Sequence, residues 1–191
     1  GLSRDASKEE ILERINNNTI TDILNKIEVK AGDVVMVKAG TIHAIGAGVF
    51  ICEIQQNSNC TYRMYDYDRR DKFGNPRELH VKKALDVVDN HKYIKDNKTE
   101  VVIARNEHFT EERLVQCKYF EVYKYDVNDE AKITVDEASF VSVLFINGSG
   151  TIETDDYEKT MEFKAGDSFF VSAGLRSIII KGQATMVVTR V

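Results

Sequence analysis

The sequence predicts a mainly β protein with a short helical segment at its amino end. From Val29 onward, short runs rich in Val, Ile, Phe and Tyr are separated by Gly, Asp and Asn, a pattern typical of strands joined by turns. One 17-residue segment of this region recurs later in the chain, which indicates two copies of the same β unit. The strongest helical periodicity is confined to the first 27 residues.

The helical segment is predicted at residues 7–27. Ser7 and Glu10 form a capping-box pair at its start, and Thr19 with Asp22 offers a weaker second start. Apolar residues then recur at helical spacing: Ile11, Leu12, Ile15, Ile20, Ile23, Leu24 and Ile27. A second helix is predicted at residues 76–88, where the apolar residues after Pro76 also fall at roughly helical spacing.

The internal repeat joins residues 29–45 to residues 163–179, at a constant offset of 134 positions. Eight of the 17 aligned residues are identical, whereas unrelated segments would share about one. Each copy has a Gly-Asp turn, a short apolar run and an Ala-Gly turn. The copies differ near their ends, where His43 corresponds to Ser177. We expect the two segments to superpose as strand–turn–strand units.

These patterns predict that the chain is divided into four parts. Residues 1–27 form the helical segment, and residues 28–90 form a first β module. The polar residues 91–100 are predicted to link it to a second β module at residues 101–191.

The amino-acid composition argues against two classes of function, nucleic-acid binding and membrane association. The chain has 191 residues, of which 42% are hydrophobic and 30% charged, as in ordinary globular proteins. Its net charge of -5 gives no sign of the basic patch that nucleic-acid binding needs, and its apolar runs are too short to span a bilayer. We therefore expect neither a nucleic acid nor a membrane as a partner.

Three cysteines, Cys52, Cys60 and Cys117, lack the close spacing of a zinc knuckle and are odd in number, unlike a disulfide framework. They are expected to be free thiols in a reducing compartment. The first residues are polar and show no signal peptide, so a cytoplasmic location is predicted.

The pattern Gly-Asp, apolar strand and Gly-x-x-His at residues 32–43 resembles the second sequence motif of cupins, which are jelly-roll (double-stranded β-helix) barrels. Residues 143–152 resemble the closing end of the first cupin motif but contain no histidine. The resemblance implies a mainly β cupin fold with two modules, the first incomplete and the second metal-free.

A longer and more specific resemblance covers the whole chain. Four motifs occur in order: Gly40-Thr-Ile-His-Ala-Ile45, Glu53-Ile-Gln-Gln-Asn-Ser58, Thr61-Tyr-Arg-Met-Tyr-Asp-Tyr-Asp-Arg69 and Arg77-Glu-Leu-His80. At this spacing they resemble the carboxy-terminal portion of type I mannose-6-phosphate isomerases. Lys38 is a departure, because the family usually has proline before the Ala-Gly turn.

This resemblance implies a zinc enzyme that interconverts mannose 6-phosphate and fructose 6-phosphate by proton transfer through a cis-enediol. His43 maps to the last of the family's His, Glu and His zinc ligands, and Arg63 maps to its active-site arginine. Arg63 would stabilise either the enediolate or the substrate phosphate. Glu53 and Gln55 share one face of the predicted strand and are expected to line the substrate pocket.

Plainer interpretations of these residues stay open. Arg63 could pair with Asp66 or Asp68 on a sheet face, and Glu53 could pair with an arginine. His80 is expected to be structural, while His91 and His108 lie in polar stretches and are expected to be solvated. At the level of the whole protein, the alternative is a non-catalytic sugar-phosphate-binding or regulatory cupin, which uses the same fold without proton transfer.

The family's other zinc ligands precede the segment to which this chain corresponds. The resemblance therefore implies a fragment that is inactive alone and binds zinc weakly or not at all, because catalytic zinc sites use about three protein ligands. Unpaired strand edges of the incomplete module would favour self-association.

Overall fold

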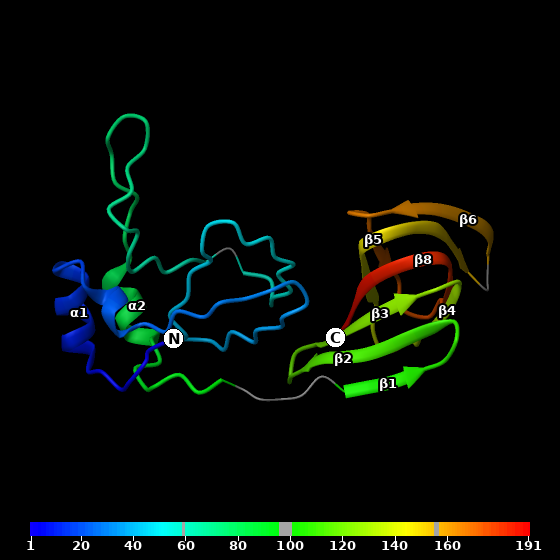
Figure 1. The fold of residues 1–191 in the computed structure, drawn as a ribbon, viewed down its shortest axis with the longest axis horizontal. Coiled ribbons are helices and arrows are strands. Elements are labelled where there is room, and N and C mark those ends of the chain that lie inside the picture. Colours follow the sequence, from blue (N-terminus) through cyan, green and yellow to red (C-terminus); the bar gives the residue numbers. More distant parts are fainter. Residues whose placement is uncertain (59, 96–100, 155–156) are drawn as a thin grey trace. The chain divides into compact units, whose positions relative to one another are not determined.

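The structure is a computed structural model that describes residues 1–58, 60–95, 101–154 and 157–191. It divides into two compact units, Gly1–Asp96 and Asn97–Val191 (Figure 1). The predicted linker at residues 91–100 lies partly outside the described residues. Strands make up the second unit and helices belong to the first, so the mainly β class with helix near the amino end is confirmed.

The second unit is one antiparallel sheet of eight strands. The strands are β1 (Val101–Arg105), β2 (Phe109–Gln116), β3 (Glu121–Val127), β4 (Glu130–Val135), β5 (Val141–Thr154), β6 (Tyr157–Lys164), β7 (Ser168–Val171) and β8 (Arg176–Arg190). Their order is β1-β2-β3-β8-β5-β6, with β4 also paired to β8 and β7 also paired to β5.

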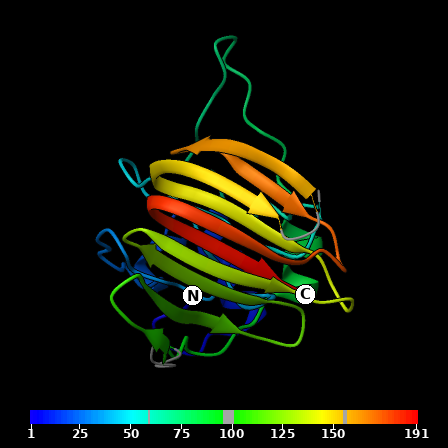
Figure 2. The same cartoon turned by 90° about the vertical axis from the view of Figure 1, so that its right-hand side faces the viewer.

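The two longest strands curl this sheet into the predicted cupin jelly roll. β8 pairs with β5 along nearly its whole length, while its other edge meets β4 at residues 176–181 and β3 at residues 184–190. The other edge of β5 likewise meets β7 and then β6. Because each long strand changes neighbours along its length, the sheet closes over an interior (Figure 2).

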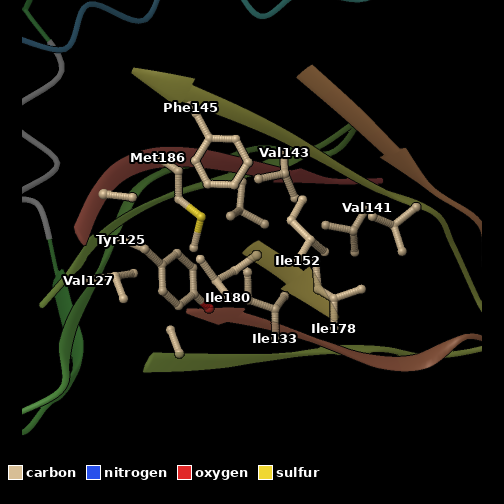
Figure 3. Packing of buried hydrophobic residues seen from close by; sticks show 14 of the residues in the cluster. Tyr125, Val127, Ile133, Val141, Val143, Phe145, Ile152, Ile178, Ile180 and Met186 are labelled. Carbon is tan, nitrogen blue, oxygen red and sulfur yellow. The ribbon is translucent and has the colours of Figure 1, made fainter. Parts of the chain in front are cut away.

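Apolar side chains fill that interior. Burial alternates along β4 and much of β5, as expected for strands with one face toward a core. The rings of Phe145 and Phe163 stack with centroids 3.7 Å apart. Figure 3 shows Phe145, Met186 and Ile180 within the same cluster, and all three are fully buried.

A glycine permits a close strand contact between β8 and β5. Gly182 lies in β8 between the stretches paired with β4 and β3, and its φ is 123°. A Cβ at this position would lie 2.5 Å from the Ser149 carbonyl oxygen of β5. No other residue could occupy the position without moving β5 away.

The first unit contains α1 (Lys8–Asn16), the 3-10 helix η1 (Ile20–Ile23) and α2 (Val81–Val87). The Ser7 hydroxyl accepts a hydrogen bond from the Glu10 amide at 3.1 Å, as the capping pattern predicts. These helices share a hydrophobic cluster whose buried members are Leu2, Ala6, Ile11, Ile15, Ile20 and Ile23. None of the described helices has the length and apolarity needed to cross a bilayer.

Both predicted helices are shorter than expected. The helical segment predicted at residues 7–27 is divided in two, because α1 ends at Asn16 and Asn18 takes a positive φ of 56° before η1 begins at Ile20, after Thr19. Asparagine tolerates this conformation and commonly ends helices. The helix predicted from residue 76 begins only at Val81, since the residues before it bond back to the Arg63 region.

The strands expected at residues 29–45 are absent, although the turns of the repeat are preserved. Gly32 and Gly166 have φ values of 93° and 91°, and Gly40 and Gly174 have 83° and 82°. The expectation that both repeat copies form strands was therefore wrong. Turns depend on local sequence, whereas a strand needs a hydrogen-bonded neighbour, and residues 33–38 have no paired strand within the described residues.

Candidate functional site

The turn that carries His43 rests against the end of α2. Gly40 adopts a φ of 83°, and a Cβ there would lie 2.8 Å from the Val87 carbonyl oxygen. The Asp89 amide donates to the Gly40 carbonyl at 2.9 Å, and Ile42 packs on the hydrophobic cluster of the first unit. The helical part of the unit therefore sets where the His43 backbone lies.

The His43 imidazole is exposed and contacts the backbone of its own turn. Its Nδ1 lies 2.9 Å from the Thr41 carbonyl oxygen. Because a carbonyl oxygen only accepts hydrogen bonds, Nδ1 is the donor in this contact. Histidines that bind metals commonly donate their other ring N–H to a carbonyl or carboxylate in this way. The contact occupies Nδ1, so a metal-binding role of His43 would have to use Nε2.

Arg63 is half-buried and is held by the segment that leads into α2. Its Nη1 donates to the Glu78 carbonyl at 3.0 Å, and its backbone amide donates to His80 Nδ1 at 3.3 Å. The His80 amide in turn donates to the Arg63 carbonyl at 2.6 Å. Met64 and Tyr65 pack on the hydrophobic cluster of the unit. The same core therefore supports the backbones beside both Arg63 and His43.

A buried carboxylate lies close to Arg63 in sequence. Asp66 is 7% exposed and accepts a hydrogen bond from Arg69, while Arg77 Nη1 lies 3.7 Å from its Oδ1. The Arg69 hydrogen bond, followed by the charges of Arg69, Arg77 and Arg63, lowers the pKa of Asp66. Its Oδ2 has no hydrogen-bond partner within the described residues.

The turn after Asp66 is strained. Tyr67 and Asp68 have φ values of 56° and 50°, and the Arg69 amide donates to the Asp66 carbonyl at 3.0 Å. Two successive residues with positive φ are typical of a type I′ turn, which normally requires Gly or Asn. The Asp66–Arg69 ion pair spans the same turn and offsets this strain. Arg69 and Arg77 were not among the predicted site residues, although the Asp-x-x-Arg spacing from Asp66 to Arg69 is a signal that the sequence contains.

Glu53 and Gln55 are exposed and make no hydrogen bond or ion pair within the described part of the chain. Two hollows of the first unit lie elsewhere and are not lined by any of the four predicted site residues. They are lined by Asp5, Ala6, Ser7, Glu10, Asn90 and His91, and by Glu10, Glu13, Arg14, Asn17 and Thr19. The pocket role of Glu53 and Gln55 stays a prediction.

The described residues do not form a complete zinc site by themselves. Across residues 1–58, 60–95, 101–154 and 157–191, no three His, Cys, Asp or Glu side chains gather closely enough to hold a metal ion. A catalytic zinc site uses about three protein ligands. The second unit places Ser177 at the corresponding position, 2% exposed and beside an apolar interior.

Comparisons with known proteins identify the family. Residues 110–191 match the family model described as "Mannose-6-phosphate isomerase, cupin domain". Over 97% of its length the chain is 41% identical to YvyI of Bacillus subtilis, which carries a mannose-6-phosphate isomerase name. Over 96% it is 33% identical to the mannose-6-phosphate isomerase ManA of the same organism.

A solved structure agrees over the whole chain. The crystal structure of the mannose 6-phosphate isomerase from Bacillus subtilis matches 100% of this chain with a TM-score of 0.88 and 37% sequence identity. The chain spans 59% of that structure and 57% and 56% of YvyI and ManA. By fold, by motif order and by similarity along its whole length, the chain belongs to the mannose-6-phosphate isomerase family of cupins.

Proposed function

We propose that this chain supplies the arginine and one metal-binding histidine of a mannose-6-phosphate isomerase site. One observation carries the proposal: Ile42, next to His43, and Met64, next to Arg63, pack on the same hydrophobic cluster. Family membership supports the reaction, which interconverts mannose 6-phosphate and fructose 6-phosphate by moving a proton between C2 and C1 through a cis-enediol.

Arg63 is the proposed catalytic residue. The Glu78 carbonyl holds Nη1, and the described residues form no further side-chain hydrogen bond with this guanidinium, so its other N–H groups are available to substrate oxygens. A guanidinium stays cationic at all relevant pH values and presents a planar set of donors. It would stabilise negative charge on the enediolate or bind the substrate phosphate.

His43 is the proposed zinc ligand of this chain, through Nε2. Since the described residues supply only one of about three expected ligands, the others must come from outside them, and we expect zinc to bind this chain weakly by itself. Glu53 and Gln55 are proposed to line the substrate pocket once the zinc site is complete.

A cytoplasmic location is also proposed for this chain. Cys52, Cys60 and Cys117 are free thiols in the structure, as expected in a reducing compartment.

A coupled isomerase assay tests the proposal. The chain would be assayed by itself and joined to the part of the Bacillus subtilis enzyme that it does not match. We expect no turnover from the chain alone and measurable turnover from the joined protein. In the joined protein, Arg63→Ala should lower kcat by about 100-fold or more, since loss of one charge-stabilising donor typically costs that much.

Arg70→Ala is the matched control, because Arg70 is an exposed arginine of the same segment that pairs with Asp68 at 3.0 Å. It should leave kcat nearly unchanged. If Arg63→Ala instead lowered the melting temperature and left the rate per folded molecule unchanged, Arg63 would be a structural arginine. Binding of mannose 6-phosphate without turnover by the joined protein would favour the regulatory sugar-phosphate-binding cupin, an alternative that the isomerase names of the relatives disfavour.

A further inference from the structure

The hydrophobic face of the sheet in the second unit is bordered by a group of charged and tyrosine side chains, here called the polar border. Alternate residues of a strand lie on one face of a sheet, and directly paired residues of neighbouring strands share that face. By this rule six residues of β2, β3 and β8 lie on the face that carries the core: Glu111, Arg113, Glu121, Tyr123, Tyr125 and Arg190. Figure 3 shows Tyr125 within that core.

Two arginines of the polar border have no partner for their charge. Arg113 and Arg190 are half-buried, and neither guanidinium forms a hydrogen bond or an ion pair with the described residues. The Nε atom of Arg190 is buried and has no acceptor among these residues. Buried donors in folded proteins almost always have an acceptor, so an acceptor from outside the described chain is expected here.

The nearest paired carboxylate is already engaged by other donors. Glu121 lies directly opposite Arg190 in the β3–β8 pairing. Its Oε2 accepts from the Tyr123 hydroxyl at 2.6 Å, and its Oε1 accepts from the Gln116 amide. Glu121 is therefore held by residues of β2 and β3, and it forms no ion pair with Arg190 among the described contacts.

Both arginines lie near the Tyr123 ring. The Arg190 Cζ atom is 5.5 Å from the ring centroid, and Arg113 is the directly paired residue of Tyr123 on β2. Burial and the Glu121 hydrogen bond raise the pKa of Tyr123, while the positive charges of Arg190 and Arg113 act in the opposite direction. Two cationic groups from different strands thus approach one aromatic side chain.

We propose that Arg113 and Arg190 bind the phosphate group of a small ligand beside Tyr123, at the polar border of the second unit. A guanidinium presents a planar fork of donors that matches phosphate oxygens, and these charge-assisted hydrogen bonds are strong. A phosphate monoester carries a charge of about -1.5 to -2 at pH 7, which balances two guanidinium groups.

This site differs from the one proposed for isomerisation. His43 and Arg63 belong to the first unit. Ser177, the residue that corresponds to His43 in the second unit, pairs with Thr134 on β4 and is not part of the polar border. Failure of the phosphate site would therefore leave the isomerase proposal untouched, and the reverse also holds.

Nuclear magnetic resonance of the arginine side chains tests the proposal on the whole chain. The chain would be labelled with 15N-arginine and titrated with inorganic phosphate at constant ionic strength. The Nε–H signals of Arg113 and Arg190 should shift together and reach saturation, and the Arg190 Nε proton should exchange more slowly with water when phosphate is bound. No catalytic activity is needed for this measurement.

Three variants make the test specific. Arg113→Gln and Arg190→Gln should each weaken phosphate binding by about tenfold or more, because each removes a charge-assisted donor. Arg105→Gln is the matched control, because Arg105 is an exposed arginine on neighbouring β1, and it should leave the affinity unchanged. Backbone amide spectra would verify the fold of each variant, and the titration of the unaltered chain decides the matter even where a variant does not fold.

The same titration with mannose 6-phosphate separates two sources of the phosphate group. Tighter binding than that of inorganic phosphate would support a sugar phosphate as the ligand, and equal binding would support recognition of the phosphate group alone. Absence of a saturable shift at millimolar phosphate would overturn the proposal. Equal shifts with acetate, or equal weakening by Arg105→Gln, would also overturn it, because general attraction of anions would then explain the signals.

Discussion

At the scale of single residues, Asp66 shows how a charge can be buried beside a candidate site. Its carboxylate lies next to three arginines, of which Arg69 bonds it directly and Arg77 lies at 3.7 Å. Burial of an ion is costly unless it is paired, and Asp66 is the buried member here, because the side chains of Arg69 and Arg77 are 60% and 50% exposed. Asp66 therefore stabilises the loop that follows Arg63.

We predict that Asp66→Asn destabilises the first unit more than Asp68→Asn, since Asp68 pairs with Arg70 at an exposed position. The folded pKa of Asp66 is below its ordinary value, so its contribution is present above about pH 4 and is lost as the pH falls through the folded pKa. Urea midpoints of both variants, measured at pH 7 and pH 3, check this. A difference between variants that is as large at pH 3 as at pH 7 would contradict it.

At the scale of elements, a charged pair joins two turns of the second unit. His108, before β2, places Nδ1 2.8 Å from Oδ1 of Asp129, which lies between β3 and β4. The Asp129 carbonyl accepts from the Gly182 amide at 2.7 Å, so the pair also connects to β8. Hydrogen bonding to Asp129, then its charge, raises the pKa of His108, and the nearby Glu107 and Glu130 act in the same direction.

Because the folded pKa of His108 is raised, its contribution to stability is complete below about pH 6.5 and is lost as the pH rises through the folded value. We predict that His108→Gln lowers the denaturation midpoint of the second unit at pH 5.5 and has less effect at pH 9. The pair is half-exposed, so the effect should also shrink in high salt. Asp129→Asn should give the same pH dependence, and an effect that is independent of pH in both variants would contradict the pairing.

At the scale of the whole molecule, the two units have separate hydrophobic cores. The cluster of the second unit is built on β-strands, and that of the first unit on helices and on residues beside the candidate site. The site residues His43 and Arg63 thus depend on the first core, while the second unit is supported by Phe145, Met186 and their neighbours.

We predict that Phe145→Ala destabilises the second unit by about 3–5 kcal/mol, the usual cost of removing a buried aromatic ring. Hydrogen exchange should then speed up in β5 and β8, while amides of α1 keep their protection. Phe170→Ala is the control, because Phe170 is 70% exposed on neighbouring β7. Equal loss of protection in α1 would show that the two cores unfold as one.

The sequence by itself determined the features that depend on neighbours along the chain. The Ser7–Glu10 cap, the positive φ of Gly32 and its repeat partner Gly166, and the β character of the second unit were all readable from local residue types. The motif order also identified the family, because it needs no knowledge of contacts.

Tertiary structure decided what depends on residues far apart in sequence. Residues 163–179 form strands because β4 and β5 pair with them, whereas the repeat copy at residues 29–45, identical at eight of 17 positions, forms none within the described structure. The burial of Asp66 among three arginines and the shared core beneath His43 and Arg63 likewise arise from packing. A strand or a site exists only when separate segments supply hydrogen bonds and contacts to one another, and this pairing is not encoded in either segment alone.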